Sequence, residues 1–193
     1  MTERTRCDWC LSAEDYIEYH DREWGVPCYD DGKQFEFLIL EAAQAGLSWL
    51  TVLRKREGYR NAFAHFNAEA VAAFSDAEIE ALITNPAIIR NKLKISAAVN
   101  NARHFLEVQQ EFGTFSKYIW SFVGDKPIVN HWETIKDVPA TSAESDVLSK
   151  DLKKRGFKFV GSTIIYAHMQ ACGLVNDHLI SCHRHREVQK IRS

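Results

Sequence analysis

Apolar residues recur along most of this 193-residue chain with the spacing of amphipathic helices. In residues 31–46, Phe35 and Leu38 belong to one apolar stripe, and Gly46 follows it as a candidate C-terminal cap. A second helix is expected to begin near Ser48. Since no run of residues alternates cleanly between polar and apolar, as a half-buried strand would, the pattern predicts an all-α fold.

Further signals set the limits of other helices. The sequence Ser-Asp-Ala-Glu at the start of residues 75–83 is a capping box, so a helix is predicted there. A long apolar pattern predicts another helix over about residues 88–111. Thr141 or Ser142 can cap a third helix that ends at Arg155.

A short glycine-bounded segment, Gly156 to Gly161, interrupts two helical patterns and predicts a helix, hairpin and helix over about residues 143–173. Glycine permits backbone conformations denied to other residues, so N–H groups of the hairpin and of the next helix can face a phosphate. Lys154 and Lys158 add positive charge. The alternative is an αα-hairpin that serves packing alone.

Composition adds few constraints of its own. The chain is 46% hydrophobic and 26% charged with a net charge of -2, which is ordinary for a globular protein of one domain, or of two closely packed lobes, over residues 1–193. Basic residues gather near 54–60, 90–94 and 150–158. These clusters would either contact phosphates or form solvated helix faces. No apolar stretch is long enough to span a bilayer, so no membrane partner is expected.

Cysteine and histidine residues near the two ends of the chain suggest a metal site. Cys7, His20, His178 and Cys182 together make a complete ligand set for a closed, structural zinc ion. Such a site, formed by segments 7–20 and 178–182, would join the two ends of the chain. Other potential ligands are Cys10, Cys28, Cys172, His183 and His185. Free buried cysteines, or a redox pair in the Cys-x-x-Cys at 7–10, are the alternatives. Five cysteines, an odd number, favour a reducing compartment, so a cytoplasmic protein is expected.

One acidic residue lies in an apolar and aromatic environment. Glu41 is the only charge between Phe37 and Leu53. An unpaired buried carboxylate is costly, so Glu41 either reaches solvent or binds a cation in an apolar pocket. Aromatic residues that could stack on a flat ligand, or form a small core, are Trp9, Tyr16, Tyr19, Trp24 and Trp49.

The sequence closely resembles the DNA-3-methyladenine glycosylase I family. The resemblance covers nearly the whole chain and is carried by residues 6–9, 16–27, 40–49, 154–161 and 169–178. It implies a zinc-containing, all-helical member of the helix-hairpin-helix DNA glycosylases. The implied substrate is double-stranded alkylated DNA, the released product is free 3-methyladenine, and a monomer is expected.

The resemblance also implies roles for individual residues. Cys7, His20, His178 and Cys182 match the zinc ligands, although the additional Cys10 leaves open which N-terminal thiolate binds the metal. Glu41 matches the carboxylate that recognises the base, Tyr16 and Trp49 match the stacking aromatics, and Trp9 and Tyr19 line the base pocket. Lys154, Gly156, Lys158 and Gly161 match the DNA-binding hairpin.

The implied chemistry depends on the substrate itself. A purine methylated at N3 is cationic in DNA and leaves as a neutral base, so the enzyme mainly extrudes and holds it while water attacks the sugar. The resemblance places Asn176 where helix-hairpin-helix glycosylases have their catalytic aspartate, and Asp177 is expected to point elsewhere. No lysine occupies the lyase position, which indicates a monofunctional enzyme. A non-catalytic zinc-stabilised DNA-binding module and a Cys7–Cys10 oxidoreductase are the competing functions.

Overall fold

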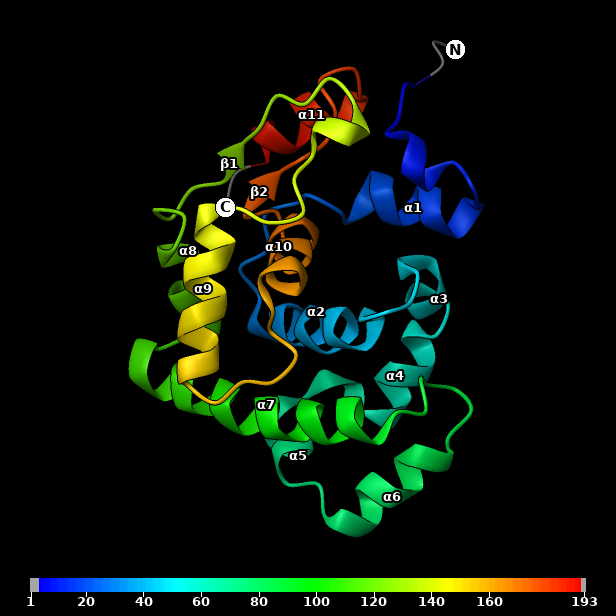
Figure 1. Ribbon diagram of the computed structural model, residues 1–193, viewed down its shortest axis with the longest axis vertical. Coiled ribbons are helices and arrows are strands. Elements are labelled where there is room, and N and C mark those ends of the chain that lie inside the picture. Colours follow the sequence, from blue (N-terminus) through cyan, green and yellow to red (C-terminus); the bar gives the residue numbers. More distant parts are fainter. Residues whose placement is uncertain (1–3, 192–193) are drawn as a thin grey trace.

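Helices dominate the computed structural model, which describes residues 4–191 (Figure 1). The α-helices are α1 Glu14–Arg22, α2 Asp31–Gln44, α3 Trp49–Leu53, α4 Arg56–Ala62, α5 Ala68–Ala72, α6 Asp76–Thr84, α7 Lys92–Phe112, α8 Phe115–Ser121, α9 Ala143–Lys154, α10 Ser162–Ala171 and α11 His183–Glu187. Short 3-10 helices are η1 Asp8–Cys10, η2 Ala64–Phe66, η3 Ile135–Asp137 and η4 Val188–Lys190. The prediction of an all-α fold is confirmed, and in the described part of the chain no helix is long and apolar enough to cross a membrane.

Side-chain caps set several of the helix starts. Ser75 and Glu78 form the predicted capping box at α6, and Ser48 accepts a hydrogen bond from the backbone N–H of Thr51 at the start of α3. Ser142 caps α9. These side chains satisfy backbone N–H groups that lack an intrahelical partner, which is why the sequence alone located these boundaries.

The long helix α7 begins later than its apolar pattern predicts. Asn91 caps it by accepting a hydrogen bond from the backbone N–H of Lys94, so residues 88–91 lie outside the helix. Ile88 is nevertheless buried, through the turn that precedes the cap. The apolar spacing therefore extended beyond the helix because a loop residue also enters the core.

Helix α2 lies at the centre of the molecule, against α3, α7, α8 and α10 (Figure 1). Each residue from Gln34 to Ala43 is buried, including Glu36 and Glu41. A helix that is covered on all sides holds its side chains in fixed positions, because neighbouring elements restrict it from several directions. Glu41 therefore projects from one of the most constrained elements of the fold.

Helices α9 and α10 are joined by residues 155–161 and pack against each other, as the predicted helix, hairpin and helix require. Gly156 has a φ of +96°, and a Cβ there would lie 2.5 Å from Nε2 of His104, so only glycine fits. Asn101 of α7 accepts from the backbone N–H of Lys158 and donates to its carbonyl oxygen. These bonds fix the hairpin on α7.

Two very short strands were not predicted. β1 Ile128–Val129 and β2 Val175–Asn176 are parallel, with Ile128 opposite Val175 and Val129 opposite Asn176. Two residues are too few to produce an alternating pattern, so the sequence could not predict these strands. Their pairing brings the loop after β1 beside the segment that follows α10.

Candidate functional site

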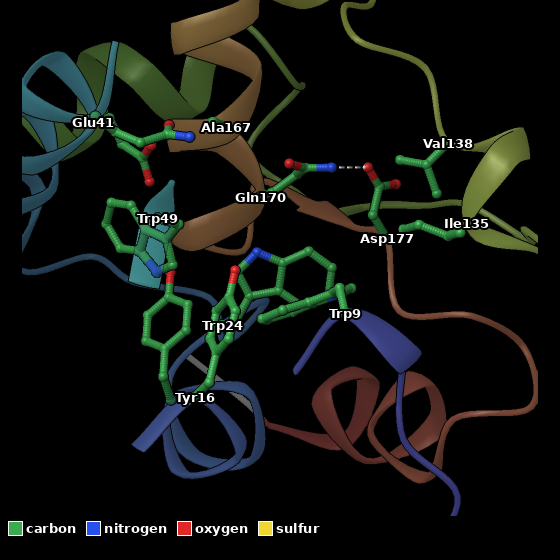
Figure 2. A pocket seen from close by; sticks show the side chains of 12 residues that line it. Trp9, Tyr16, Trp24, Glu41, Trp49, Ile135, Val138, Ala167, Gln170 and Asp177 are labelled. Atoms are coloured by element: carbon green, nitrogen blue, oxygen red, sulfur yellow. Dashed lines mark hydrogen bonds between the residues drawn. The ribbon is translucent and has the colours of Figure 1, made fainter. Parts of the chain in front are cut away.

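A cavity of about 220 Å³ opens between the N-terminal segment, α2 and α10 (Figure 2). The residues that line it are Trp9, Tyr16, Tyr19, Trp24, Glu41, Gln44, Trp49, Ile135, Val138, Ala167, Gln170 and Asp177. Glu41 and the four aromatic residues assigned from the sequence to a base pocket thus share one cavity. The lining is mainly apolar and aromatic, with a few polar groups, as in sites for flat organic ligands.

Glu41 is buried in this cavity without a protein partner. Its side chain is 3% exposed, and among the described residues it has no hydrogen bond or ion pair. Burial raises the pKa of Glu41 to about 8. The alternative that Glu41 reaches solvent is therefore wrong. A cation entering the cavity would stabilise the ionised form, because their attraction is strong where water is excluded.

Aromatic rings on the N-terminal side hold one another in fixed orientations. The ring of Trp9 packs edge-on against Tyr16, with centroids 4.8 Å apart, and against Trp24, with centroids 5.0 Å apart. The ring of Tyr19 lies next to that of Trp49, with centroids 5.5 Å apart. Because each ring is restrained by another, their arrangement is formed before any ligand arrives. The indole nitrogen of Trp49 is buried and lacks a partner within the described chain.

The expectation that Asp177 points away from the site is wrong. Asp177 lines the cavity, whereas Asn176 donates its side-chain amide to the carbonyl oxygen of His185. Asn176 ends β2, and successive residues of extended chain project to opposite sides, so only one of the two neighbours can face the cavity. The carboxylate of Asp177 accepts hydrogen bonds from Asn130, Trp132, Tyr166 and Gln170.

Several lining residues were not assigned to the site from the sequence. Ala167 and Gln170 lie three residues apart on α10, so they share one helix face. That spacing was a usable signal for Gln170. Ile135 and Val138 come from the loop that follows β1, and the irregular backbone there carries no periodicity that could have identified them.

The four cysteine and histidine residues proposed as metal ligands form one buried cluster. One ligand atom from each of Cys7, His20, His178 and Cys182 lies within 4.8 Å of all the others. Cys182 Sγ is 3.5 Å from His20 Nε2 and 3.7 Å from His178 Nδ1. A tetrahedral site with Zn–S bonds of about 2.3 Å and Zn–N bonds of about 2.0 Å has S···N edges of about 3.5 Å. The cluster can therefore hold a metal ion.

Groups around the cluster orient the ligands. His20 Nδ1 lies 2.8 Å from Asp21 Oδ1, which leaves Nε2 for the metal, and Arg6 in turn binds Asp21. His178 Nε2 lies 3.0 Å from the carbonyl oxygen of Trp24, which leaves Nδ1. Such outer contacts fix the imidazole tautomer in metal sites.

The neighbouring cysteine, Cys10, is turned away from this cluster. Its thiol donates to the carbonyl oxygen of Cys7, 3.1 Å away. Cys7 is therefore the N-terminal thiolate of the cluster. The hydrogen bond between Cys7 and Cys182, together with burial, raises the pKa of the Cys7 thiol. Without a cation, Cys7 therefore tends to keep its proton. A bound metal ion would allow both Cys7 and Cys182 to be thiolates, because its positive charge compensates for theirs.

The hairpin exposes the two lysines assigned to DNA binding. Lys154 and Lys158 are exposed and have no ion pair among the described residues. By contrast, Arg155 binds Glu111 and Asp151. In the basic segment at 54–60, each arginine likewise forms internal ion pairs. The hairpin therefore presents two exposed lysines without ion pairs among the described residues, whereas the arginines of the 54–60 segment are all paired.

Comparisons with known proteins agree on one family. The family model described as methyladenine glycosylase matches residues 9–185. DNA-3-methyladenine glycosylase 1 of Escherichia coli is 50% identical over 177 residues, which are 92% of this chain and 95% of the relative. A crystal structure of 3-methyladenine DNA glycosylase I superposes with a TM-score of 0.91 at 49% identity, over 93% of this chain and 98% of that chain. A variant of 3-methyladenine DNA glycosylase I in complex with 3-methyladenine gives a TM-score of 0.90 at 39% identity, over 92% and 96%.

Proposed function

Because the chain belongs to the methyladenine glycosylase family, we propose that it is a monofunctional base-excision repair enzyme that hydrolyses the N-glycosidic bond of 3-methyladenine in alkylated DNA. The observation that carries this proposal is Glu41, a buried carboxylate without a partner in the described chain, in a cavity with aromatic walls. A flat cationic base complements this site in both shape and charge.

The chemistry follows from the positive charge of the base. Methylation at N3 makes the purine cationic in DNA, so breaking the glycosidic bond releases a neutral base and little acid catalysis is needed. The enzyme extrudes the nucleotide, because the target bond is inaccessible within the duplex. Glu41 accepts hydrogen bonds from the base and favours its cationic form. Tyr16 and Trp49 hold the faces of the base, while Trp9 and Tyr19 complete the walls.

The hairpin is proposed to bind a DNA phosphate. Gly161 has an ordinary φ of -60°, and a Cβ there would meet nothing within 4 Å, so the protein's own packing does not require glycine. A close approach by an external group gives a reason for it. Helix α10 starts at Ser162 without a side-chain cap, so its first N–H groups are available to an anion. Gly156 shapes the turn, and Lys154 and Lys158 supply positive charge.

The metal is proposed to be one zinc ion per chain, held by Cys7, His20, His178 and Cys182. Thiolate and imidazole ligands are typical of structural zinc sites, and four protein ligands leave no open position for substrate or water. Bound zinc would supply a cross-link between the chain ends, with no part in bond cleavage. Five cysteines without a disulfide, two of them proposed zinc ligands, are compatible with a cytoplasmic enzyme, and we propose that it acts as a monomer.

The decisive experiment is incubation of the protein with methylated duplex DNA, followed by chromatography of the released bases. Release of free 3-methyladenine, with the DNA strand left intact, is the expected result. Binding to DNA without release would instead support a non-catalytic DNA-binding module. The zinc proposal disfavours the redox alternative, since Cys7 would be a metal ligand and the Cys10 thiol donates to the carbonyl oxygen of Cys7.

A further inference from the structure

Asp177 is held by an unusually complete set of hydrogen-bond donors. Its Oδ1 accepts from Nδ2 of Asn130 at 2.7 Å and from Nε1 of Trp132 at 2.8 Å. Its Oδ2 accepts from the hydroxyl of Tyr166 at 2.6 Å and from Nε2 of Gln170 at 2.8 Å. The side chain is 2% exposed. Four donors saturate the carboxylate, so this group is fixed in place by protein contacts.

The hydrogen bond from Gln170 to Asp177 determines which way the Gln170 side chain faces. An amide has a donor end and an acceptor end, and the hydrogen bond to Asp177 occupies the donor end. Figure 2 shows the amide oxygen of Gln170 turned away from Asp177, toward the side of the cavity where Glu41 and Trp49 lie. That oxygen accepts no hydrogen bond from the described residues. The cavity thus has a second acceptor, held on a different helix from Glu41.

We propose that Gln170 contacts the extruded cationic nucleotide through its amide oxygen, and that Asp177 is a positioning residue that acts through Gln170. This inference rests on the proposed function, since it assumes a cationic purine in the cavity. The negative end of the amide dipole faces the delocalised positive charge of the base and can accept a hydrogen bond from it. Asp177 itself, with its oxygens already occupied, has no free lone pair directed at the substrate.

The geometry predicts what Asp177→Asn would do. The indole N–H of Trp132 can only donate, so the side facing Trp132 and Asn130 must keep its oxygen. The new amide nitrogen therefore faces Tyr166 and Gln170. The hydroxyl of Tyr166 can rotate to accept, but Gln170 must turn its amide over. Its NH₂ group would then point into the cavity, toward the positive charge of the base.

A double-mutant cycle tests this arrangement, with single-turnover release of 3-methyladenine from methylated duplex DNA as the readout. Gln170→Ala should lower the rate about 10-fold, the loss typical of one hydrogen bond to a charged group. Asp177→Asn should lower it more, about 100-fold, because an acceptor is replaced by an opposing donor. In the Gln170→Ala background, Asp177→Asn should cost less than about 2-fold, because no amide remains to be reoriented.

A charge-exchanged pair provides a rescue that a merely structural role would not give. In Asp177→Asn with Gln170→Glu, the new amide donates to the new carboxylate, which again presents an acceptor to the cavity. This variant should release 3-methyladenine at least about 10-fold faster than Asp177→Asn alone. Asp31→Asn is the matched control, because Asp31 also accepts from a glutamine amide, that of Gln109, but lies outside the cavity. It should keep the wild-type rate.

Three outcomes separate the possibilities, provided that melting temperature and zinc content are measured for each variant. Equal losses from Asp177→Asn in the wild-type and Gln170→Ala backgrounds would overturn the proposal and make Asp177 a direct participant. A wild-type rate for Gln170→Ala would overturn it too. If the wild-type protein releases no 3-methyladenine at all, the proposed function fails, and that result is distinct from either failure of this inference.

Discussion

At the scale of single residues, Glu41, which is buried and unpaired among the described residues, is the physical reason to expect a cationic ligand in the cavity. A carboxylate surrounded by aromatic and apolar groups is unfavourable in the empty protein, and burial raises its pKa to about 8. A cationic ligand compensates for this cost, whereas a neutral base does not. The residue was identifiable from the sequence because it is the only charge between Phe37 and Leu53. Only the structure shows that Glu41 is buried and has no partner in the described chain.

Glu41→Gln tests this role while preserving the shape of the side chain. We expect release of 3-methyladenine to fall about 10- to 100-fold, as for loss of a hydrogen bond between charged groups. Zinc content should be unchanged and the melting temperature should not fall. Wild-type excision in this variant would show that the charge of Glu41 is not used.

The raised pKa of Glu41 also predicts a pH dependence of stability. In the folded protein without substrate, Glu41 keeps its proton up to about pH 8, whereas in the unfolded chain it ionises near its ordinary value of about 4.5. Between these values the folded state binds more protons, so the wild type loses stability as pH rises, and the loss is complete above about pH 8.

The comparison of wild type with Glu41→Gln isolates this effect. The variant cannot ionise, so its stability advantage should grow from pH 5 to pH 8, by about 1 to 4 kcal/mol. Denaturant titrations of both proteins across this range measure the difference, and the pH dependence of metal binding, common to both, cancels. A constant difference would mean that Glu41 is already ionised at pH 5.

At the scale of elements, capped helices were predictable and tertiary contacts were not. The starts of α6 and α9 follow from Ser75 and Ser142, because a cap is a local interaction. The start of α7 was placed too early, since buried Ile88 continues the apolar spacing through a turn. The β1–β2 pair, which orients Asp177 toward the cavity, depends on contacts between distant segments and has no local signal.

The α9–α10 hairpin should control affinity for DNA without affecting the choice of base. Lys154→Ala or Lys158→Ala should weaken binding to any duplex and reduce the slope of log K against log salt by about 1. Excision should remain confined to cationic alkylpurines, because these lysines do not line the cavity. Binding measured over a salt series checks this, with Lys117→Ala, another exposed lysine, as the control. An altered ratio of released bases would place the hairpin in base recognition.

At the scale of the whole molecule, the cluster of Cys7, His20, His178 and Cys182 links the two ends of the chain. His183 donates its backbone N–H to the carbonyl oxygen of Thr5, and Leu179 donates to Cys7 Sγ. The sequence contained these four candidate ligands, but their spacing left several other ligand sets open. The family resemblance selected this set, and the geometry agrees with it. Local reasoning could not do so, because the pairing spans almost the entire chain.

The cluster should also support the cavity, because the segment between Cys7 and His20 carries Trp9, Tyr16 and Tyr19. Removing two of the proposed zinc ligands by Cys7→Ala with Cys182→Ala should abolish zinc binding and lower the melting temperature by several degrees or more. Base release should decrease as well, since the aromatic wall loses its anchor.

Cys10→Ala is the matched control for this last prediction. Cys10 is buried in the same segment, yet its thiol is turned to the carbonyl oxygen of Cys7 and stands outside the cluster. This variant should retain one zinc per chain by elemental analysis and should keep its excision rate. Full metal occupancy in the double variant would refute the ligand assignment. Loss of zinc with unchanged excision would separate the metal from the cavity, because the aromatic wall would then be held by ring packing alone.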